Sequence, residues 1–341
     1  MRRPEPACAY RSPRRGMAKM EKRQFGTIGE VSRLTLGGGG IGQVWGDTSR
    51  EEGIATLKMA VDSGIDVIDA APGYRVCEAL IGEAFGGHLP NGVRITTKCG
   101  IGSPPAEEVY PRLRASLEQS LTAMRLERVD LFFLHNEICP DDFVYPVDNE
   151  RRSEFATAWS LFRGAVVPAF ERLQQEGLIG AWGITGVGVP DTIIRALEHT
   201  QRPQAVQAVA NLLDSPGGLT RLRTPARPRE IIATAQNNGV GVMGIRAVQA
   251  GALTNAFDRP LEPDHPEAVD FGRAAPFRRL CEAWGGNPAI IAHRYALTMP
   301  GVDTLVLGVK NREELRQCLD AEAAGPLSPE EIGAIDALRL R

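Results

Sequence analysis

The fold of this chain is decided by residues 93–135, where the runs VRITTK (93–98) and VDLFFLH (129–135) flank a longer segment with helical spacing. Within residues 107–124, apolar side chains recur every three or four positions, which places them on one face of a helix: Val109, Leu113, Leu117, Leu121 and Met124. Short apolar runs are typical of buried parallel strands, and such strands need a helix-length crossover between them. Residues 93–135 therefore predict a β–α–β unit.

The same alternation continues along the chain in both directions. Short apolar runs predict eight strands, at residues 34–36, 67–71, 93–98, 129–135, 179–185, 205–211, 240–248 and 304–309. Helical spacing follows each of them or precedes the next, at residues 50–63, 77–86, 107–124, 154–176, 190–199, 227–238, 275–298 and 311–320. Eight strand–helix units in 341 residues favour an α/β fold, a closed (β/α)8 TIM barrel. A doubly wound open sheet has the same alternation and is the alternative.

Three further segments complete the expected domain. Residues 24–32 hold two glycines between short extended stretches and predict an N-terminal β-hairpin that plugs the bottom of the barrel. Residues 136–153 and 249–274 exceed the length of turns, so we expect long loops at the C-terminal mouth. No shift in composition marks a second domain, and residues 23–341 are expected to form a single barrel domain.

The first 22 residues differ from the rest in charge. They carry seven basic and two acidic side chains, a net charge of +5, and three prolines disfavour an amphipathic helix. No apolar core follows the basic residues, which argues against a secretory signal. We expect residues 1–22 to be a basic, disordered tail. The alternatives are an Arg-rich transit peptide, or a native start at Met17 or Met20.

The composition excludes several classes of protein. The net charge of −3 argues against a generally basic surface for nucleic acid, and no stretch reaches the roughly 18 apolar residues of a membrane helix. The six cysteines are scattered without a C-x-x-C pair, which disfavours a disulfide framework or a zinc site and favours a reducing compartment. We therefore expect a cytoplasmic protein with no metal, no nucleic-acid partner and no membrane segment.

Four polar residues lie near the carboxyl ends of predicted strands. Asp69 ends IDVID, Lys98 ends VRITTK, His135 ends VDLFFLH, and Tyr74 comes five residues after Asp69. Because these strand ends face one mouth of a parallel barrel, we expect the four side chains to converge. The chain has five lysines and 34 arginines, so a lysine at an interior strand end indicates a need for a compact ammonium group. The alternative is an Asp69–Lys98 ion pair with a structural role alone.

Together the four groups suit proton transfer at a carbonyl or alcohol oxygen. A phenol is a poor acid near neutral pH, and an adjacent ammonium group is expected to lower its pKa while the carboxylate keeps the lysine charged. An imidazole across the site can orient a carbonyl oxygen. The set contains no source of electrons, so redox chemistry would require a cofactor.

Six segments, in this order, resemble the aldo-keto reductases, and the resemblance extends over about residues 22–340: RQFGTIGEVSRLTLGGGGIG, GIDVIDAAPGYRVCEALIGEAF, RITTKCG, RVDLFFLHN, GLIGAWGIT and GVDTLVLGVKNREEL. The resemblance implies a (β/α)8 barrel that binds NADP(H), less often NAD(H), without a Rossmann fold. It also implies a catalytic set in which Tyr74 is the general acid/base, Lys98 and Asp69 tune it, and His135 orients the carbonyl group.

Cofactor contacts are implied by the same resemblance, at Gly38, Asp69, Thr185, Gln207, Arg246, Gly308, Lys310, Asn311 and Glu314. Gln207 matches the amide that holds the nicotinamide carboxamide. Thr185-Gly186 replaces the usual Ser-Asn pair, and Arg246 replaces the usual aromatic ring over the nicotinamide. Lys310 can pair with a 2′-phosphate, which favours NADP(H) over NAD(H). Substrate contacts are expected from Trp45, Arg75 and Asn136.

The glycine run after the first predicted strand has a second interpretation. Gly37, Gly39 and Gly42 match G-x-G-x-x-G, the phosphate loop of a Rossmann fold. Residues 43–48 postpone the next helix to about Ser49, however. We therefore expect the glycines to let the first loop pass close to a bound cofactor.

The expected function is that of an NADP(H)-dependent oxidoreductase. It would transfer hydride between the nicotinamide and a carbonyl or alcohol substrate, such as an aldehyde, ketone or sugar. One alternative is a non-catalytic, NADP(H)-binding regulatory barrel, and another is an isomerase-type TIM-barrel enzyme. The substrate, the physiological direction and the oligomeric state are not indicated by the sequence.

Overall fold

A computed structural model of the chain describes residues 20–257 and 259–341. Eight parallel strands close into a barrel in the order β10-β11-β12-β3-β4-β5-β6-β9. Their bounds are β3 Leu34–Gly37, β4 Val67–Asp69, β5 Arg94–Cys99, β6 Val129–Leu134, β9 Ile179–Thr185, β10 Ala205–Val209, β11 Gly241–Ile245 and β12 Thr304–Leu307. The pairing of β12 with β3 closes the sheet, which confirms the TIM barrel and excludes the open doubly wound sheet.

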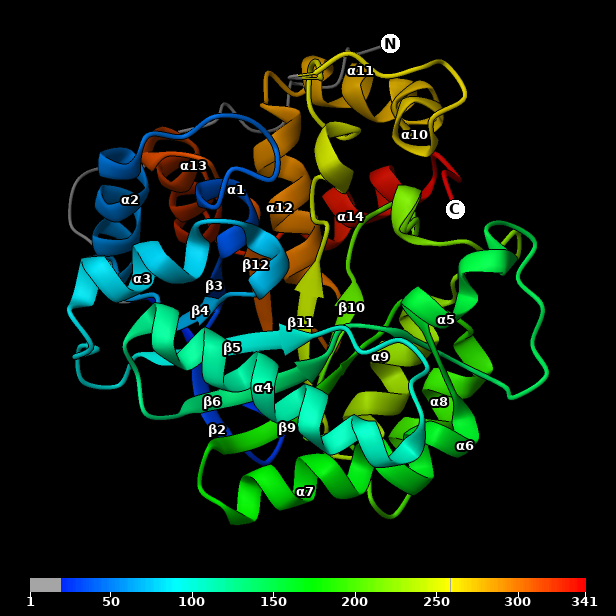
Figure 1. Cartoon of the computed structure of the whole chain (residues 1–341). Helices are drawn as coiled ribbons and strands as arrows, with labels where there is room; N and C mark the ends of the chain where they lie inside the picture. Colours follow the sequence, from blue (N-terminus) through cyan, green and yellow to red (C-terminus); the bar gives the residue numbers. More distant parts are fainter. Residues whose placement is uncertain (1–19, 258) are drawn as a thin grey trace, which may run out of the picture.

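Helices surround this barrel, as Figure 1 shows. They include α2 Arg50–Asp62, α3 Cys77–Phe85, α4 Ala106–Met124, α7 Val167–Gln175, α8 Pro190–Glu198, α9 Pro228–Asn237, α12 Pro288–Thr298 and α13 Arg312–Ala323. The five apolar residues predicted to share one face of α4 are all buried. The period of 3.6 residues thus identified the face that packs on the barrel.

The N-terminal hairpin closes the amino end of the barrel. Strands β1 Lys22–Phe25 and β2 Gly29–Ser32 pair in antiparallel register. The ring of Phe25 is buried in one cluster with Leu131, Phe133 and Met243 of the barrel strands. A side-chain carbon added to Gly241 would lie only 2.5 Å from the Phe25 ring, so this close approach requires glycine.

The boundary of the predicted tail needs correction. Lys22 begins β1 and pairs with Ser32, and Met20 is buried in the main core. Residues 20–22 are therefore part of the fold. The remainder of the predicted tail, residues 1–19, lies outside the described residues.

The long loops and two of the predicted helices contain more structure than expected. Residues 136–153 lead into a small parallel sheet of β7 Glu137–Cys139 and β8 Ala156–Ala158, so the predicted helix 154–176 is interrupted by a strand. The loop after β11 carries α10 Pro266–Arg273. The predicted helix 275–298 divides into α11 Ala275–Ala283 and α12, because Gly285 has a positive φ of 66° and Asn287 caps a new helix.

Two further short helices, α1 and α14, were not predicted either. One helical turn, α1 Gly38–Ile41, forms inside the glycine run, well before the helix start expected at about Ser49. The C-terminal helix α14 Pro329–Asp336 begins with a capping box between Ser328 and Glu331. In Figure 1, α10 and α11 lie at the top of the view, above α12 and β11.

Candidate active site

An ion pair buried at the carboxyl ends of β4 and β5 forms the centre of the site. The Lys98 ammonium donates to Asp69 Oδ2 at 2.6 Å and to the Ala70 carbonyl oxygen at 2.9 Å, and the side chain has no exposed surface. Asp69 Oδ1 accepts hydrogen bonds from the Thr96 hydroxyl at 2.6 Å and from the Gln207 amide at 2.7 Å. Every charge in the pair therefore has polar partners, as a buried pair requires.

Tyr74 and His135 complete the cluster. Tyr74 ends a short 3₁₀ turn, Pro72–Tyr74, and the Lys98 nitrogen lies 4.6 Å from the centre of its ring. The Tyr74 and His135 rings meet edge to face, with 6.3 Å between centroids. The structure thus brings together four side chains separated along the sequence by up to 66 residues.

Burial decides the protonation of the phenol and the amine. Loss of hydration raises the pKa of Tyr74, and the positive charge of Lys98 only partly opposes this effect. Our expectation of a lowered tyrosine pKa is therefore corrected. Burial alone would lower the pKa of Lys98, but Asp69 and Tyr74 outweigh it and the pKa is raised. At neutral pH the site holds a protonated phenol beside a charged amine.

His135 is neutral in this environment. Solvent reaches the ring, yet surrounding protein removes enough hydration, with help from the Lys98 charge, to lower the pKa of His135 to about 4. A neutral imidazole carries one N–H donor and one acceptor nitrogen. Its donor can bind a carbonyl oxygen without giving up its proton.

The predicted nicotinamide contacts are held by the barrel. Gln207 lies on β10 and donates to Asp69, and the Thr185 hydroxyl donates to the Leu134 carbonyl oxygen at 3.1 Å. A side-chain carbon on Gly38 would lie 2.2 Å from the Cys77 sulfur, so packing alone requires glycine there. The Rossmann interpretation is thereby excluded, since the glycines belong to a closed barrel.

Arg246 is anchored by residues from distant segments. It follows β11 with a positive φ of 63°, and its guanidinium group contacts Glu267 at 2.5 Å and Gln249 at 2.9 Å. Glu267 also accepts the backbone N–H of Gly218 at 3.0 Å. The guanidinium group is thus held by Glu267 of α10. Arg246 can therefore contact a ligand only where its guanidinium group now lies.

The predicted phosphate end lies where β12 leads into α13. Glu314 accepts the Lys310 backbone N–H at 2.8 Å and lies 3.7 Å from the Lys310 ammonium. Asn311 caps α13 by accepting the Glu314 N–H at 2.9 Å. The Arg312 N–H donates to Glu52 of α2 at 2.9 Å. Protein carboxylates therefore engage two backbone donors that an anion would use.

The three predicted substrate residues differ in their surroundings. Arg75 is exposed beside Tyr74, with a positive φ of 50°. The Asn136 side chain is buried, and its amide accepts from the Ile101 and Gly102 backbone and donates to the Phe155 carbonyl oxygen. We revise the expectation for Asn136 accordingly, to a role in holding loops. Trp45 lies against Gly39 and Gly308.

Thr96 and four exposed apolar side chains were missed by the sequence reasoning. Thr96 lies two positions before Lys98 and so shares its face of β5, a signal that could have identified it. Besides the predicted Trp45, four large apolar residues are exposed in the described part of the chain, all in segments that follow the carboxyl ends of strands: Val144, Val147, Leu219 and Val269. Exposed apolar surface is therefore present on the connections that leave the carboxyl ends of the strands.

The dinucleotide that the resemblance implies is compatible with this mouth. The buried amine of Lys98 and the partly buried phenol of Tyr74 face a neutral imidazole, while Lys310 and an exposed Gly308 lie at the other end. An elongated anion with an aromatic ring system at each end requires both kinds of surface. Cation, glycine and aromatic groups are thus available at the positions expected to hold it.

Comparison with known proteins identifies the class. A model of the Aldo/keto reductase family matches residues 33–340, and the chain belongs to this family. It is 23% identical to L-galactose dehydrogenase of Arabidopsis thaliana, covering 94% of this chain and 95% of that protein. It is 26% identical to the NADH-specific methylglyoxal reductase of Escherichia coli, covering 93% and 94%.

Solved structures agree on the fold. The holo form of aldo-keto reductase AKR11C1 from Bacillus halodurans superposes with a TM-score of 0.68 at 22% identity, covering 94% of this chain and 96% of that one. Family membership supports a nicotinamide-dependent oxidoreductase that acts on carbonyl or alcohol groups. In the described residues, no helix has the length and apolar content to cross a bilayer.

Proposed function

We propose that this protein reduces carbonyl compounds, or oxidises the corresponding alcohols, with Tyr74 as the general acid/base. The observation that carries the proposal is the buried contact of Lys98 with Asp69 and the Tyr74 ring, opposite His135. A bound dihydronicotinamide supplies the hydride to the carbonyl carbon. Tyr74 gives its hydroxyl proton to the carbonyl oxygen, and in oxidation it receives that proton back.

The other members of the cluster act on this proton. Lys98, positive and fixed by Asp69, stabilises the phenolate that Tyr74 becomes, because opposite charges attract strongly where water is excluded. The neutral imidazole of His135 donates a hydrogen bond that orients the carbonyl oxygen. Thr96 and Gln207 hold Asp69 and so fix the pair in place. The cluster is arranged before the substrate binds, which reduces the cost of reorganisation.

The cofactor site is proposed to extend from Thr185, Gln207 and Arg246 at the nicotinamide to Gly38, Gly308, Lys310, Asn311 and Glu314 at the nucleotide. Lys310 supports a preference for NADP(H), since an ammonium group attracts a 2′-phosphate. The nearby Glu314 carboxylate reduces that advantage, so we expect NAD(H) to be accepted as well.

The proposed substrate is an aldehyde, a ketone or a sugar. Apolar side chains at the mouth and the exposed Arg75 support a substrate with a polar group and some apolar surface. We further propose that the enzyme works in the cytoplasm. The five cysteines of the described residues are free and buried, as suits a reducing compartment.

The experiment combines catalysis with binding. The purified chain is assayed for loss of NADPH and NADH absorbance with a panel of aldehydes, ketones and sugars, and for the reverse reaction with alcohols. Turnover that depends on Tyr74 is the expected result. Cofactor binding without turnover of any substrate would instead identify a regulatory barrel. Chelator-sensitive activity without cofactor binding would identify an isomerase-type enzyme.

A further inference from the structure

Trp45 has an unusual position for a large aromatic residue. It belongs to residues 42–49, the loop between α1 and α2, and 40% of its surface is exposed. A side-chain carbon added to Gly39 would lie 2.8 Å from the indole carbon Cη2, and one added to Gly308 would lie 3.0 Å from Cζ3. Two glycines from neighbouring strand ends thus form a flat seat for this ring.

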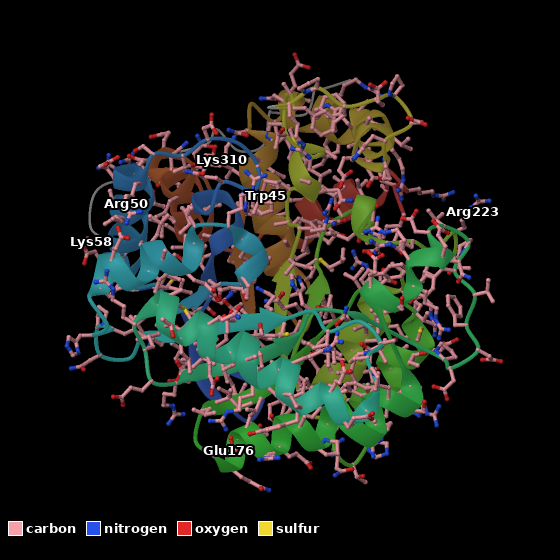
Figure 2. The ribbon with its side chains drawn as sticks, viewed as in Figure 1. Trp45, Arg50, Lys58, Glu176, Arg223 and Lys310 are labelled. Atoms are coloured by element: carbon pink, nitrogen blue, oxygen red, sulfur yellow. The ribbon has the colours of Figure 1, made fainter. Side chains whose placement is uncertain are left out.

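The loop that carries Trp45 is fastened to the same region. The Val44 N–H donates to the Gly39 carbonyl oxygen and the Gln43 N–H to the Gly40 carbonyl oxygen, both at 3.0 Å. The Gln43 side chain donates to the Thr48 carbonyl oxygen at 2.8 Å. The Thr48 hydroxyl donates to the Lys310 carbonyl oxygen at 3.2 Å. Figure 2 shows Trp45 and Lys310 on the same part of the molecule. The loop is therefore attached to the segment that follows β12.

We propose that Trp45 is a contact of the cofactor phosphates that covers them when the dinucleotide is bound, and that it is not a wall of the substrate pocket. This inference rests on the proposed function, because it places the phosphates at Gly308–Asn311. Trp45 lies on Gly308, and its indole N–H has no partner among the described residues. An indole offers an apolar face and one donor, which suits a phosphate lying on backbone glycine.

The position of the Trp45 indole on Gly308 means that the indole must move when a phosphate binds there. In the present arrangement the indole lies within van der Waals contact of Gly308, so it occupies space that a phosphate against the same glycine requires. Gly46, next to Trp45, has a positive φ of 122° and nothing within contact distance of an added side-chain carbon. The loop therefore has room to move the Trp45 ring away from Gly308. The hydrogen bond between Thr48 and Lys310 opposes this movement. Cofactor exchange is limited by this loop.

Tryptophan fluorescence of the full chain tests this proposal. The chain has four tryptophans, and Trp45 is the most exposed of the described set. Titration with NADP⁺ or NAD⁺, excited at the red edge of the indole band, is expected to change the emission of the wild type. Trp45→Phe should lose most of that change, whereas Trp284→Phe, at the end of α11, should keep it.

Dissociation rates give an independent readout. Because Trp45→Phe loses the indole N–H donor and part of the aromatic surface, it should release the cofactor about three- to tenfold faster in stopped-flow displacement. Thr48→Val, which removes the hydroxyl contacts to the Lys310 and Gly40 carbonyl oxygens, should speed release and preserve the fluorescence change. Folding is checked by circular dichroism, and Thr48→Val keeps the test valid where Trp45→Phe is unstable.

The outcomes separate this inference from the proposed function. If calorimetry detects no NADP⁺ or NAD⁺ binding to the wild type, the proposed function fails together with the inference. If the cofactor binds and is turned over, but Trp45→Phe retains both the fluorescence change and the wild-type release rate, the inference alone is overturned.

Discussion

The acid–base cluster and the nucleotide end of the mouth differ in how far they are prepared for a ligand. In the cluster, Lys98, Asp69 and Thr96 already make hydrogen bonds of 2.6 Å around the position of Tyr74. At the nucleotide end, protein carboxylates engage the Lys310 and Arg312 N–H groups. The comparison indicates that the chemical end is preorganised, whereas the nucleotide end must exchange internal contacts for those with a cofactor.

The largest expected effect concerns the preorganised end. Tyr74→Phe should lower kcat by about 10²- to 10⁴-fold, because it removes the proton donor. The dissociation constants of NADPH and NADH should stay within about twofold, since the nucleotide end is untouched. Steady-state kinetics and calorimetry measure the two quantities. Near-wild-type turnover would remove Tyr74 from its proposed role.

Lys98→Met tests whether the buried pair stabilises the fold as well as the chemistry. It leaves the Asp69 carboxylate buried without its cation, so the free energy of unfolding should fall by about 3–5 kcal/mol. The double variant Lys98→Met/Asp69→Asn should recover most of that loss in denaturant titrations and still lack turnover. A double variant with restored activity would show that the pair has a structural role alone.

A smaller effect is expected at the nucleotide end. Lys310→Ala should weaken NADPH binding by roughly three- to tenfold and NADH binding by less than about twofold, because a partly exposed charge makes a modest contribution. Lys58→Ala, an exposed lysine on α2, is the matched control and should change neither. Equal losses for the two cofactors would contradict a 2′-phosphate contact at Lys310.

The smallest expected effect concerns pH: the titration of His135 should leave kcat/KM unchanged between pH 8 and about 5. Because the pKa of His135 is lowered to about 4, the ring stays neutral from pH 8 down to about 5, and kcat/KM for reduction should show no His135 inflection near the ordinary value of about 6.5. The unfolded chain takes up this proton near 6.5 and the folded chain only near 4. His135 therefore lowers stability as the pH falls through that window. An inflection near 6.5 that His135→Gln abolishes would contradict a neutral imidazole.

The strands and the cluster could be predicted from sequence because both depend on local pattern. The apolar runs coincide with all eight barrel strands, and the polar residues at their ends meet because parallel strands share one mouth. Predicting Asp69, Lys98 and His135 required only the position of each strand end and the closure of the barrel. Thr96 follows the same logic through the two-residue period of a strand.

The contacts of the loops could not be predicted in this way. Glu267 binds Arg246 from a helix 21 residues away, and Glu52 binds Arg312 across 260 residues. Such pairings depend on how the loops and helices that follow the strands pack against one another at the mouth of the barrel. The periodicity of apolar residues along the sequence carries no information about this packing. The lowered tyrosine pKa was expected from one charge alone, and burial outweighed that charge. Asn136 likewise carried no signal that its amide binds loop backbone.

The most direct test follows hydride and proton in a single turnover. The chain is mixed with cofactor deuterated at the transferring position and an accepted carbonyl substrate, and the product is examined by mass spectrometry. We predict that the wild type places deuterium on the carbonyl carbon, and that Tyr74→Phe binds as much cofactor but transfers at least about 10²-fold more slowly. Transfer by Tyr74→Phe at the wild-type rate, or a product without deuterium, would contradict the account.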